Sequence, residues 1–164
     1  MRLKAFRDCR QLADFVCSTY GTRGRTELQT RRREREKGMY YLTIEDHFSS
    51  AHQLRGYKGK CENLHGHNWR VVLTVRGTKL NDIGILIDFH DLKKFLKSIM
   101  AEIDHINLNE FPPFDRENPS SENLACWIFS RVSVLLKENG FSDIITDSIT
   151  VYESDTSRCT YRES

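Results

Sequence analysis

The segment from His65 to Gly77 constrains the fold of this chain more than any other. His65-Gly66-His67 is followed directly by Asn-Trp-Arg-Val-Val-Leu-Thr-Val, a run rich in the β-branched and aromatic residues that favour strands. Side chains at positions i and i+2 of a strand point to the same face, so His65 and His67 are expected side by side. His52 lies thirteen residues before His65 and can return on the neighbouring strand of a hairpin. The segment therefore predicts a hairpin that gathers three imidazoles.

Three imidazoles with one open coordination position are typical of a catalytic zinc site, because a structural site closes with a fourth protein ligand. We therefore expect Zn²⁺ bound by His52, His65 and His67, although imidazoles also accept other divalent ions. Cys61 lies four residues before His65. An unpaired cysteine is often a small buried hydrophobe, whereas lysines in the preceding loop and a nearby dication would favour a reactive thiolate.

The composition is that of an ordinary globular protein, with 38% hydrophobic and 29% charged residues in a chain of 164. This length is typical of one domain with a sizeable core. No apolar run has the length of a membrane span, and the N-terminus lacks the apolar centre of a signal peptide. The five cysteines are odd in number and form no CxxC motif, which favours a reducing compartment over a disulfide framework. We expect the protein in the cytoplasm.

Charge is unevenly distributed along the chain. Residues 1–38 hold 11 Lys/Arg against 5 Asp/Glu, and residues 39–164 hold 14 against 18. The basic run at 30–37 could contact nucleic acid or anionic lipid, but its interleaved glutamates favour a solvated, disordered or helical extension. Acidic residues also argue against a mitochondrial presequence, and a start codon at Met39 stays open. We expect a basic extension at 1–38, no nucleic-acid partner, and a folded domain at 39–164.

Periodicity predicts four strands and two helices. The expected strands cover residues 39–48, 66–77, 144–153 and 158–162. The expected helices cover residues 89–103, capped by Asp88, and about 121–139, capped by Ser120 or Ser121 and ended by Gly140. This order predicts an α+β fold in which an antiparallel sheet carries both helices on one face. The free edges of so small a sheet favour oligomerisation.

Six short motifs occur in order along residues 39–164. They are Phe48-Ser-Ser-Ala-His52, Cys61-Glu-Asn-Leu-His-Gly-His67, Leu86-Ile-Asp-Phe89, Ile103-Asp-His-Ile-Asn-Leu108, Asn118-Pro-Ser-Ser-Glu-Asn123 and Val151-Tyr-Glu-Ser154. Together they resemble the 6-pyruvoyl-tetrahydropterin synthase and 6-carboxytetrahydropterin synthase family. The resemblance implies a tunnelling fold (T-fold), in which each subunit supplies four antiparallel strands and two helices. It also implies a homo-oligomeric barrel, often a hexamer made of two trimers, with active sites where subunits meet.

The resemblance also implies roles for individual residues. Cys61 would abstract a proton from the substrate side chain, Asp104 would orient His105, and His105 would relay protons. Zinc would hold two hydroxyl groups of the substrate side chain. From the residues alone, Asp104 and His105 could equally be a helix cap and a surface histidine.

Pterin contacts are expected near the C-terminus and at the start of the second helix. Glu153 is either an exposed strand residue or, as the resemblance implies, a carboxylate that accepts two hydrogen bonds from the pterin. Ser120, Ser121 and Glu122 match the pterin-contacting segment of the family. The substrate triphosphate needs cations, and the sequence does not choose among the candidates Arg55, Lys58, Lys60, Arg158 and Arg162.

The spacing of Cys61 and His65 bears on the reaction. Cys-x3-His resembles the bacterial 6-carboxytetrahydropterin synthases of queuosine and deazapurine biosynthesis, whereas the pyruvoyl synthases usually carry Cys-x5-His. The resemblance implies a lyase that converts 7,8-dihydroneopterin triphosphate to 6-carboxy-5,6,7,8-tetrahydropterin, acetaldehyde and triphosphate. The alternatives are 6-pyruvoyl-tetrahydropterin synthase, a pterin- or purine-binding protein without turnover, and a zinc-dependent RNA-binding module using residues 23–37. A pure binder would not need Cys61, Asp104 and His105.

Overall fold

The computed structural model describes residues 38–59 and 62–164. The expected basic extension, apart from Gly38, and the candidate residues Lys60 and Cys61 lie outside the described residues. The strands are β1 (Tyr40–His52), β2 (His65–Gly77), β3 (Ile145–Tyr152) and β4 (Arg158–Tyr161). The helices are α2 (Phe89–Ile103), the short 3-10 helix η2 (Leu108–Glu110) and α3 (Ser121–Glu138). Among the described helices, none has the length and apolar character that crossing a bilayer requires.

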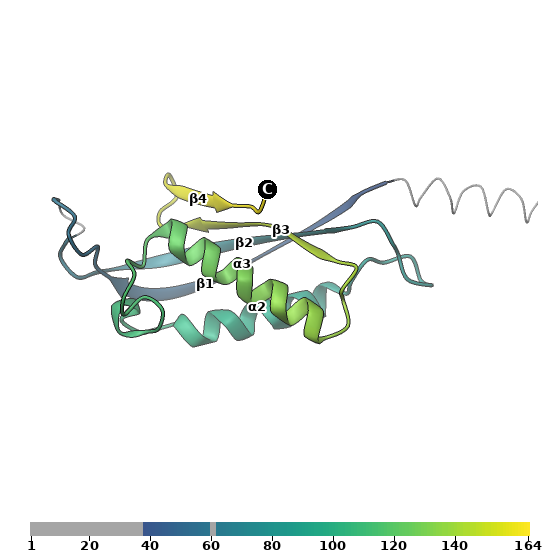
Figure 1. Ribbon diagram of the computed structural model, residues 1–164, viewed down its shortest axis with the longest axis horizontal. Helices are drawn as coiled ribbons and strands as arrows, with labels where there is room; N and C mark the ends of the chain where they lie inside the picture. Colours follow the sequence, from purple (N-terminus) through teal and green to yellow (C-terminus); the bar gives the residue numbers. More distant parts are fainter. Residues whose placement is uncertain (1–37, 60–61) are drawn as a thin grey trace, which may run out of the picture. The chain divides into compact units, whose positions relative to one another are not determined.

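The four strands form one antiparallel sheet in the order β1-β2-β3-β4 (Figure 1). Helix α2 packs against β1, α3 packs against β3 and β4, and both helices cover the same face of the sheet. The predicted α+β arrangement with two helices on one face is confirmed. The opposite face of the sheet carries no helix in the described part of the chain.

The core lies between this sheet and the two helices. In β2, every second residue from Trp69 to Val75 is fully buried, as expected for a strand with one covered face. The apolar stripe of α2 is buried against it. Asp88 accepts a hydrogen bond from the His90 backbone as the N-cap of α2, and Ser120 caps α3 in the same way, so both predicted helix starts are confirmed.

Strand β1 extends four residues beyond the end of the predicted strand at 39–48. The added segment, Ser49-Ser50-Ala51-His52, has little intrinsic strand propensity, so local sequence ended the prediction too early. Backbone hydrogen bonds hold it on both sides: β2 pairs with one edge, and the other edge is bonded to residues 105–106. This tertiary support extends β1 as far as His52 and therefore fixes where that imidazole lies.

Candidate metal centre and active site

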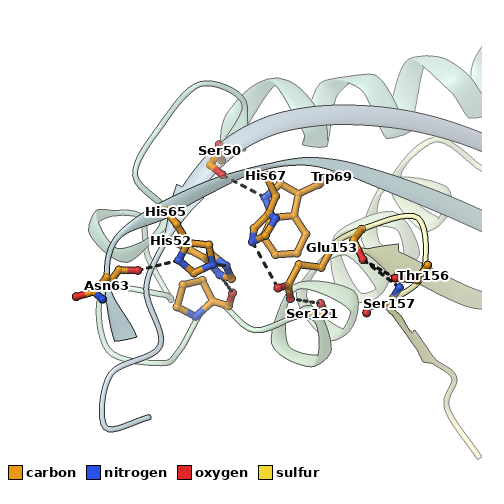
Figure 2. A network of polar contacts seen from close by, with 12 residues as sticks. Ser50, His52, Asn63, His65, His67, Trp69, Ser121, Glu153, Thr156 and Ser157 are labelled. Atoms are coloured by element: carbon orange, nitrogen blue, oxygen red, sulfur yellow. Dashed lines mark hydrogen bonds and ion pairs between the residues drawn. The ribbon is translucent and has the colours of Figure 1, made fainter. Parts of the chain in front are cut away.

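Three imidazoles meet on the helix-covered face of the β1–β2 hairpin (Figure 2). The register pairs His52 directly with His65, and their Nε2 atoms lie 3.2 Å apart. The ring centroid of His67 lies 5.2 Å from that of His52 and 4.8 Å from that of His65. The predicted hairpin therefore brings the three rings together.

Backbone carbonyls fix the tautomers of two of these rings. The Pro119 carbonyl accepts from Nδ1 of His52 at 2.8 Å, and the Asn63 carbonyl accepts from Nδ1 of His65 at 2.7 Å. A carbonyl only accepts, so in each neutral ring the proton is on Nδ1 and Nε2 presents its lone pair. Two lone pairs then face each other across 3.2 Å, an arrangement that a cation between them would stabilise. A carbonyl behind the ring is the usual support of a metal-ligating histidine.

His67 supplies a third donor atom. Its Nε2 is buried and has no hydrogen-bond partner within the described residues. Burial lowers the pKa of both His67 and His52 below the usual 6.5, which favours the neutral ring that can bind a metal ion.

Glu153 follows β3 and points toward His67 (Figure 2). Its Oε1 lies 3.4 Å from the His67 Nε2, and its Oε2 accepts a hydrogen bond from the Ser121 hydroxyl at 3.3 Å. One ligand atom from each of His52, His65, His67 and Glu153 lies within 4.8 Å of the others. Imidazole and carboxylate ligands suit zinc and several other divalent ions, so this group could hold a metal ion whose identity the geometry leaves open.

Trp69 forms an apolar wall beside the imidazoles, a role that was not predicted from the sequence. Its ring centroid lies 4.9 Å from that of His52 and 5.2 Å from that of His67, and its Nε1 donates to the Ser50 carbonyl at 3.3 Å. Strand alternation places Trp69 on the same face as His65 and His67, so the sequence did contain the signal.

Asp104 and His105 form an oriented pair at the outer edge of β1. The Asp104 Oδ2 lies 2.9 Å from the His105 Nδ1, and Oδ1 accepts from the Ser49 backbone N–H at 2.8 Å. This backbone hydrogen bond, followed by that from the His105 ring, lowers the pKa of Asp104 below its usual 3.8. The His105 backbone has a φ of 57° and donates to the Ser49 carbonyl. With Nδ1 engaged, Nε2 is the ring nitrogen available for proton exchange.

Asp104 and His105 are not part of the four-residue metal-binding group. His105 of this pair and His67 of that group border the same cavity. This cavity of about 520 Å³ is lined by His67 and His105, together with Ser49, Ala51 and Asn68 among others. The cavity therefore places His105 beside the segment of the hairpin that carries His67.

Comparison with known proteins identifies the family of this chain. A family model described as 6-pyruvoyl tetrahydropterin synthase matches residues 41–164. The chain belongs to this family. The solved structure of the 6-pyruvoyl tetrahydropterin synthase of Caenorhabditis elegans resembles it with a TM-score of 0.68 and 26% identity, covering 77% of this chain and 97% of that one. The predicted T-fold subunit is thus confirmed.

Relatives within the family carry two different names. A 6-carboxy-5,6,7,8-tetrahydropterin synthase of Synechocystis sp. is 34% identical over 128 residues, which are 75% of this chain and 93% of the relative. A 6-pyruvoyl tetrahydrobiopterin synthase of Dictyostelium discoideum is 34% identical over 109 residues, covering 59% of this chain and 81% of the relative. Family membership therefore does not by itself choose between the two reactions.

The residues expected to bind the pterin have different environments. Ser121 is buried and bonded to Glu153, so it belongs to the same network. The Ser120 hydroxyl accepts from the Asn123 backbone as the cap of α3, and Glu122 is exposed in the first turn.

Three of the candidates for triphosphate binding, Arg55, Arg158 and Arg162, contact other residues of the protein. The Arg55 guanidinium donates to the carbonyls of Phe114 and Glu117. Arg158 lies over the Tyr152 ring, and Arg162 pairs with Asp147. Arg55 therefore supports a loop, and the other two contact side chains of β3.

Proposed function

We propose that this protein is a lyase that converts 7,8-dihydroneopterin triphosphate and water into 6-carboxy-5,6,7,8-tetrahydropterin, acetaldehyde and triphosphate. The observation that carries the proposal is the convergence of three imidazoles with Glu153 in one group that could hold a metal ion. The three-residue spacing between Cys61 and His65 favours the carboxy product over the pyruvoyl product. A cytoplasmic role in queuosine or deazapurine synthesis follows from that choice of product.

Substrate binding would use the three imidazoles for the side chain of the substrate and the Glu153 carboxylate for the pterin ring. His52, His65 and His67 would hold a zinc ion, which when bound supplies a Lewis acid for the two side-chain hydroxyls. The Glu153 carboxylate would accept hydrogen bonds from the 2-amino group and ring N–H of the pterin. The Ser121 hydroxyl, already bonded to Oε2, orients that carboxylate, and Ser120 and Glu122 would contact the pterin at the start of α3.

Proton transfer would use Cys61, Asp104 and His105. The Cys61 thiolate would remove a proton from the substrate side chain. Asp104 holds the Nδ1–H of His105, so the Nε2 of that ring can accept a proton and return it. The resulting tautomerisation oxidises the side chain and reduces the ring without an external redox cofactor. Triphosphate then leaves, one water adds its oxygen to the side-chain carbon next to the ring, and cleavage of the carbon–carbon bond beyond it releases acetaldehyde and leaves the 6-carboxyl group.

The working form would be a homo-oligomeric barrel built as two trimers. This assembly is supported by the positions of β1 and β4 at the two edges of the sheet and by exposed Tyr41 and Ile145 on its helix-free face. Light scattering should give a mass of three or six subunits, and a monomer would contradict the assembly. Residues 39–164 would form the catalytic domain, so a chain that begins at Met39 should keep turnover in the same assay.

A second candidate is 6-pyruvoyl-tetrahydropterin synthase, in which triphosphate is eliminated and the side chain is retained. The name of the Dictyostelium discoideum relative favours it. Both reactions require the same metal and the same proton relay, so only the product separates them.

Turnover itself is tested by metal removal. Zinc-loaded protein should consume 7,8-dihydroneopterin triphosphate, chelator-treated protein should not, and added zinc should restore the loss, as followed by chromatography of the pterins. Consumption by the metal-free protein would contradict the proposal. Tight pterin binding without consumption would favour the binding protein instead.

A further inference from the structure

Glu153 lies where a metal ligand would lie. Its Oε1 is 3.4 Å from the His67 Nε2, and the Nε2 atoms of His52 and His65 are 3.2 Å apart. In a tetrahedral site with bonds of about 2.0–2.1 Å, neighbouring ligand atoms are about 3.3–3.4 Å apart. Each of these two distances therefore matches an edge of such a tetrahedron, and all four ligand atoms lie within 4.8 Å of one another.

The contact between His67 and Glu153 is not a hydrogen bond. Charge-assisted bonds between nitrogen and a carboxylate are about 2.7–2.9 Å long. The observed 3.4 Å exceeds this, and the buried Nε2 of His67 has no hydrogen-bond partner in the described chain. Two donor atoms that face each other without a shared proton are placed to share a metal ion.

The surroundings of Glu153 hold its carboxylate in this position. The Ser121 hydroxyl donates to Oε2, and the Glu153 backbone N–H donates to the Ser157 carbonyl at 3.1 Å at the start of the β3–β4 turn (Figure 2). Oε1 is thereby directed toward the imidazoles and Oε2 toward α3.

We propose that Glu153 is the fourth metal ligand of the substrate-free protein and that a bound pterin takes this carboxylate away from the metal. The proposal rests on the proposed function, in which both oxygens of Glu153 accept hydrogen bonds from the pterin. To accept two hydrogen bonds from the pterin, Glu153 must use Oε1, the oxygen that faces His67 in the substrate-free protein. Release of that oxygen opens a coordination position for the side-chain hydroxyls, so the site is closed until a pterin is bound.

The ligand role is tested by the affinity for zinc alone, measured by chelator competition. Glu153→Gln should bind zinc at least about tenfold more weakly than the wild type. Glu153→Asp keeps the charge but shortens the side chain, so it should also bind zinc more weakly. The matched control is Glu45→Gln, because Glu45 is exposed, pairs with Arg70 and loses the same charge. Unchanged zinc affinity in correctly folded Glu153→Gln would overturn the ligand role.

The exchange is tested with unsubstituted pterin, whose binding is followed by its fluorescence. This probe has no side-chain hydroxyls to replace the carboxylate at the metal. If metal and pterin compete for Glu153, zinc loading should weaken pterin binding to the wild type at least about threefold, with reciprocal coupling. Equal or tighter binding to the zinc-loaded protein would overturn the exchange.

The same variants separate this proposal from the proposed function. If Glu153→Gln keeps its zinc affinity but no longer binds pterin, the ligand role fails and the pterin contact stands. If Glu153→Gln binds zinc weakly, while zinc-free Glu153→Gln binds pterin as tightly as the zinc-free wild type, the ligand role stands and the pterin contact fails.

Discussion

The Nε2 atoms of His52 and His65 lie 3.2 Å apart, although the Nδ1 of each ring is bonded to a backbone carbonyl. Both rings thus present lone pairs to the same point. Burial lowers the pKa of His52, which favours the neutral ring that can bind a metal ion over the protonated ring that cannot. The arrangement explains why these two positions on neighbouring strands need histidine.

The first prediction concerns metal content. His65→Ala should lose the bound zinc, because the variant lacks one of the three imidazoles that hold the ion. His47→Ala is the matched control, since His47 is an exposed histidine of the same strand as His52. Elemental analysis of the purified proteins measures both, and full zinc occupancy in His65→Ala would remove this residue from the site.

The second prediction concerns the thiol. Cys61→Ala should keep zinc and pterin binding but lose turnover by about 10²–10⁴-fold, the usual contribution of a general base. Steady-state kinetics and zinc analysis on one preparation provide the two readouts. A parallel fall in zinc content would mean that Cys61 is a ligand, and the proton-transfer role would then be wrong.

The third prediction concerns the orientation of His105. Asp104→Asn should lower kcat by about 10²-fold or more with little change in KM, because an amide cannot stabilise the protonated ring. Zinc content should be unchanged, since Asp104 is not part of the metal-binding group. A rise in KM with kcat intact would assign Asp104 to substrate binding.

The fourth prediction concerns acid stability. The pKa of Asp104 is lower in the folded protein than its usual 3.8, so below about pH 4 the unfolded chain binds the proton more readily. The stabilisation is therefore present above this pH and is lost as the pH falls through the lowered pKa. Urea unfolding between pH 3 and 6 should show a smaller acid loss in Asp104→Asn, and an equally steep loss would contradict the assigned shift.

The fifth prediction concerns the support behind His52. The Asn118 side chain accepts from the Arg55 backbone N–H at 2.8 Å and donates to its carbonyl at 3.0 Å, one residue before the carbonyl that holds His52. Asn118→Ala should lower the free energy of unfolding by about 1–2 kcal/mol and weaken zinc binding several-fold. Asn139→Ala, at the far end of α3, should leave zinc affinity unchanged. Equal zinc affinity in both variants would contradict this supporting role.

The order of elements could be predicted because each leaves a periodic signal in the sequence. The stripe of α2, its Asp88 cap and the alternation in β2 are local features. The end of β1 could not be predicted, because Ser49-Ser50-Ala51 forms a strand only through bonds to residues distant in sequence.

The candidate site, like the fold, could be predicted only where the signal is local in the sequence. Strand alternation was enough to place His65 and His67 together, and the hairpin supplied His52. The carbonyls of Pro119 and Asn63 could not be identified, since every residue carries one and only the fold selects them. The contact between His67 and Glu153 depends on the β2–β3 register and the following turn, which the sequence pattern does not specify.

Mass spectrometry of the products that zinc-loaded protein forms from 7,8-dihydroneopterin triphosphate decides between the two reactions of the family. We expect 6-carboxy-5,6,7,8-tetrahydropterin together with acetaldehyde and triphosphate. A product that keeps the full side chain as the 6-pyruvoyl group would contradict this expectation and assign the protein to the other reaction of its family.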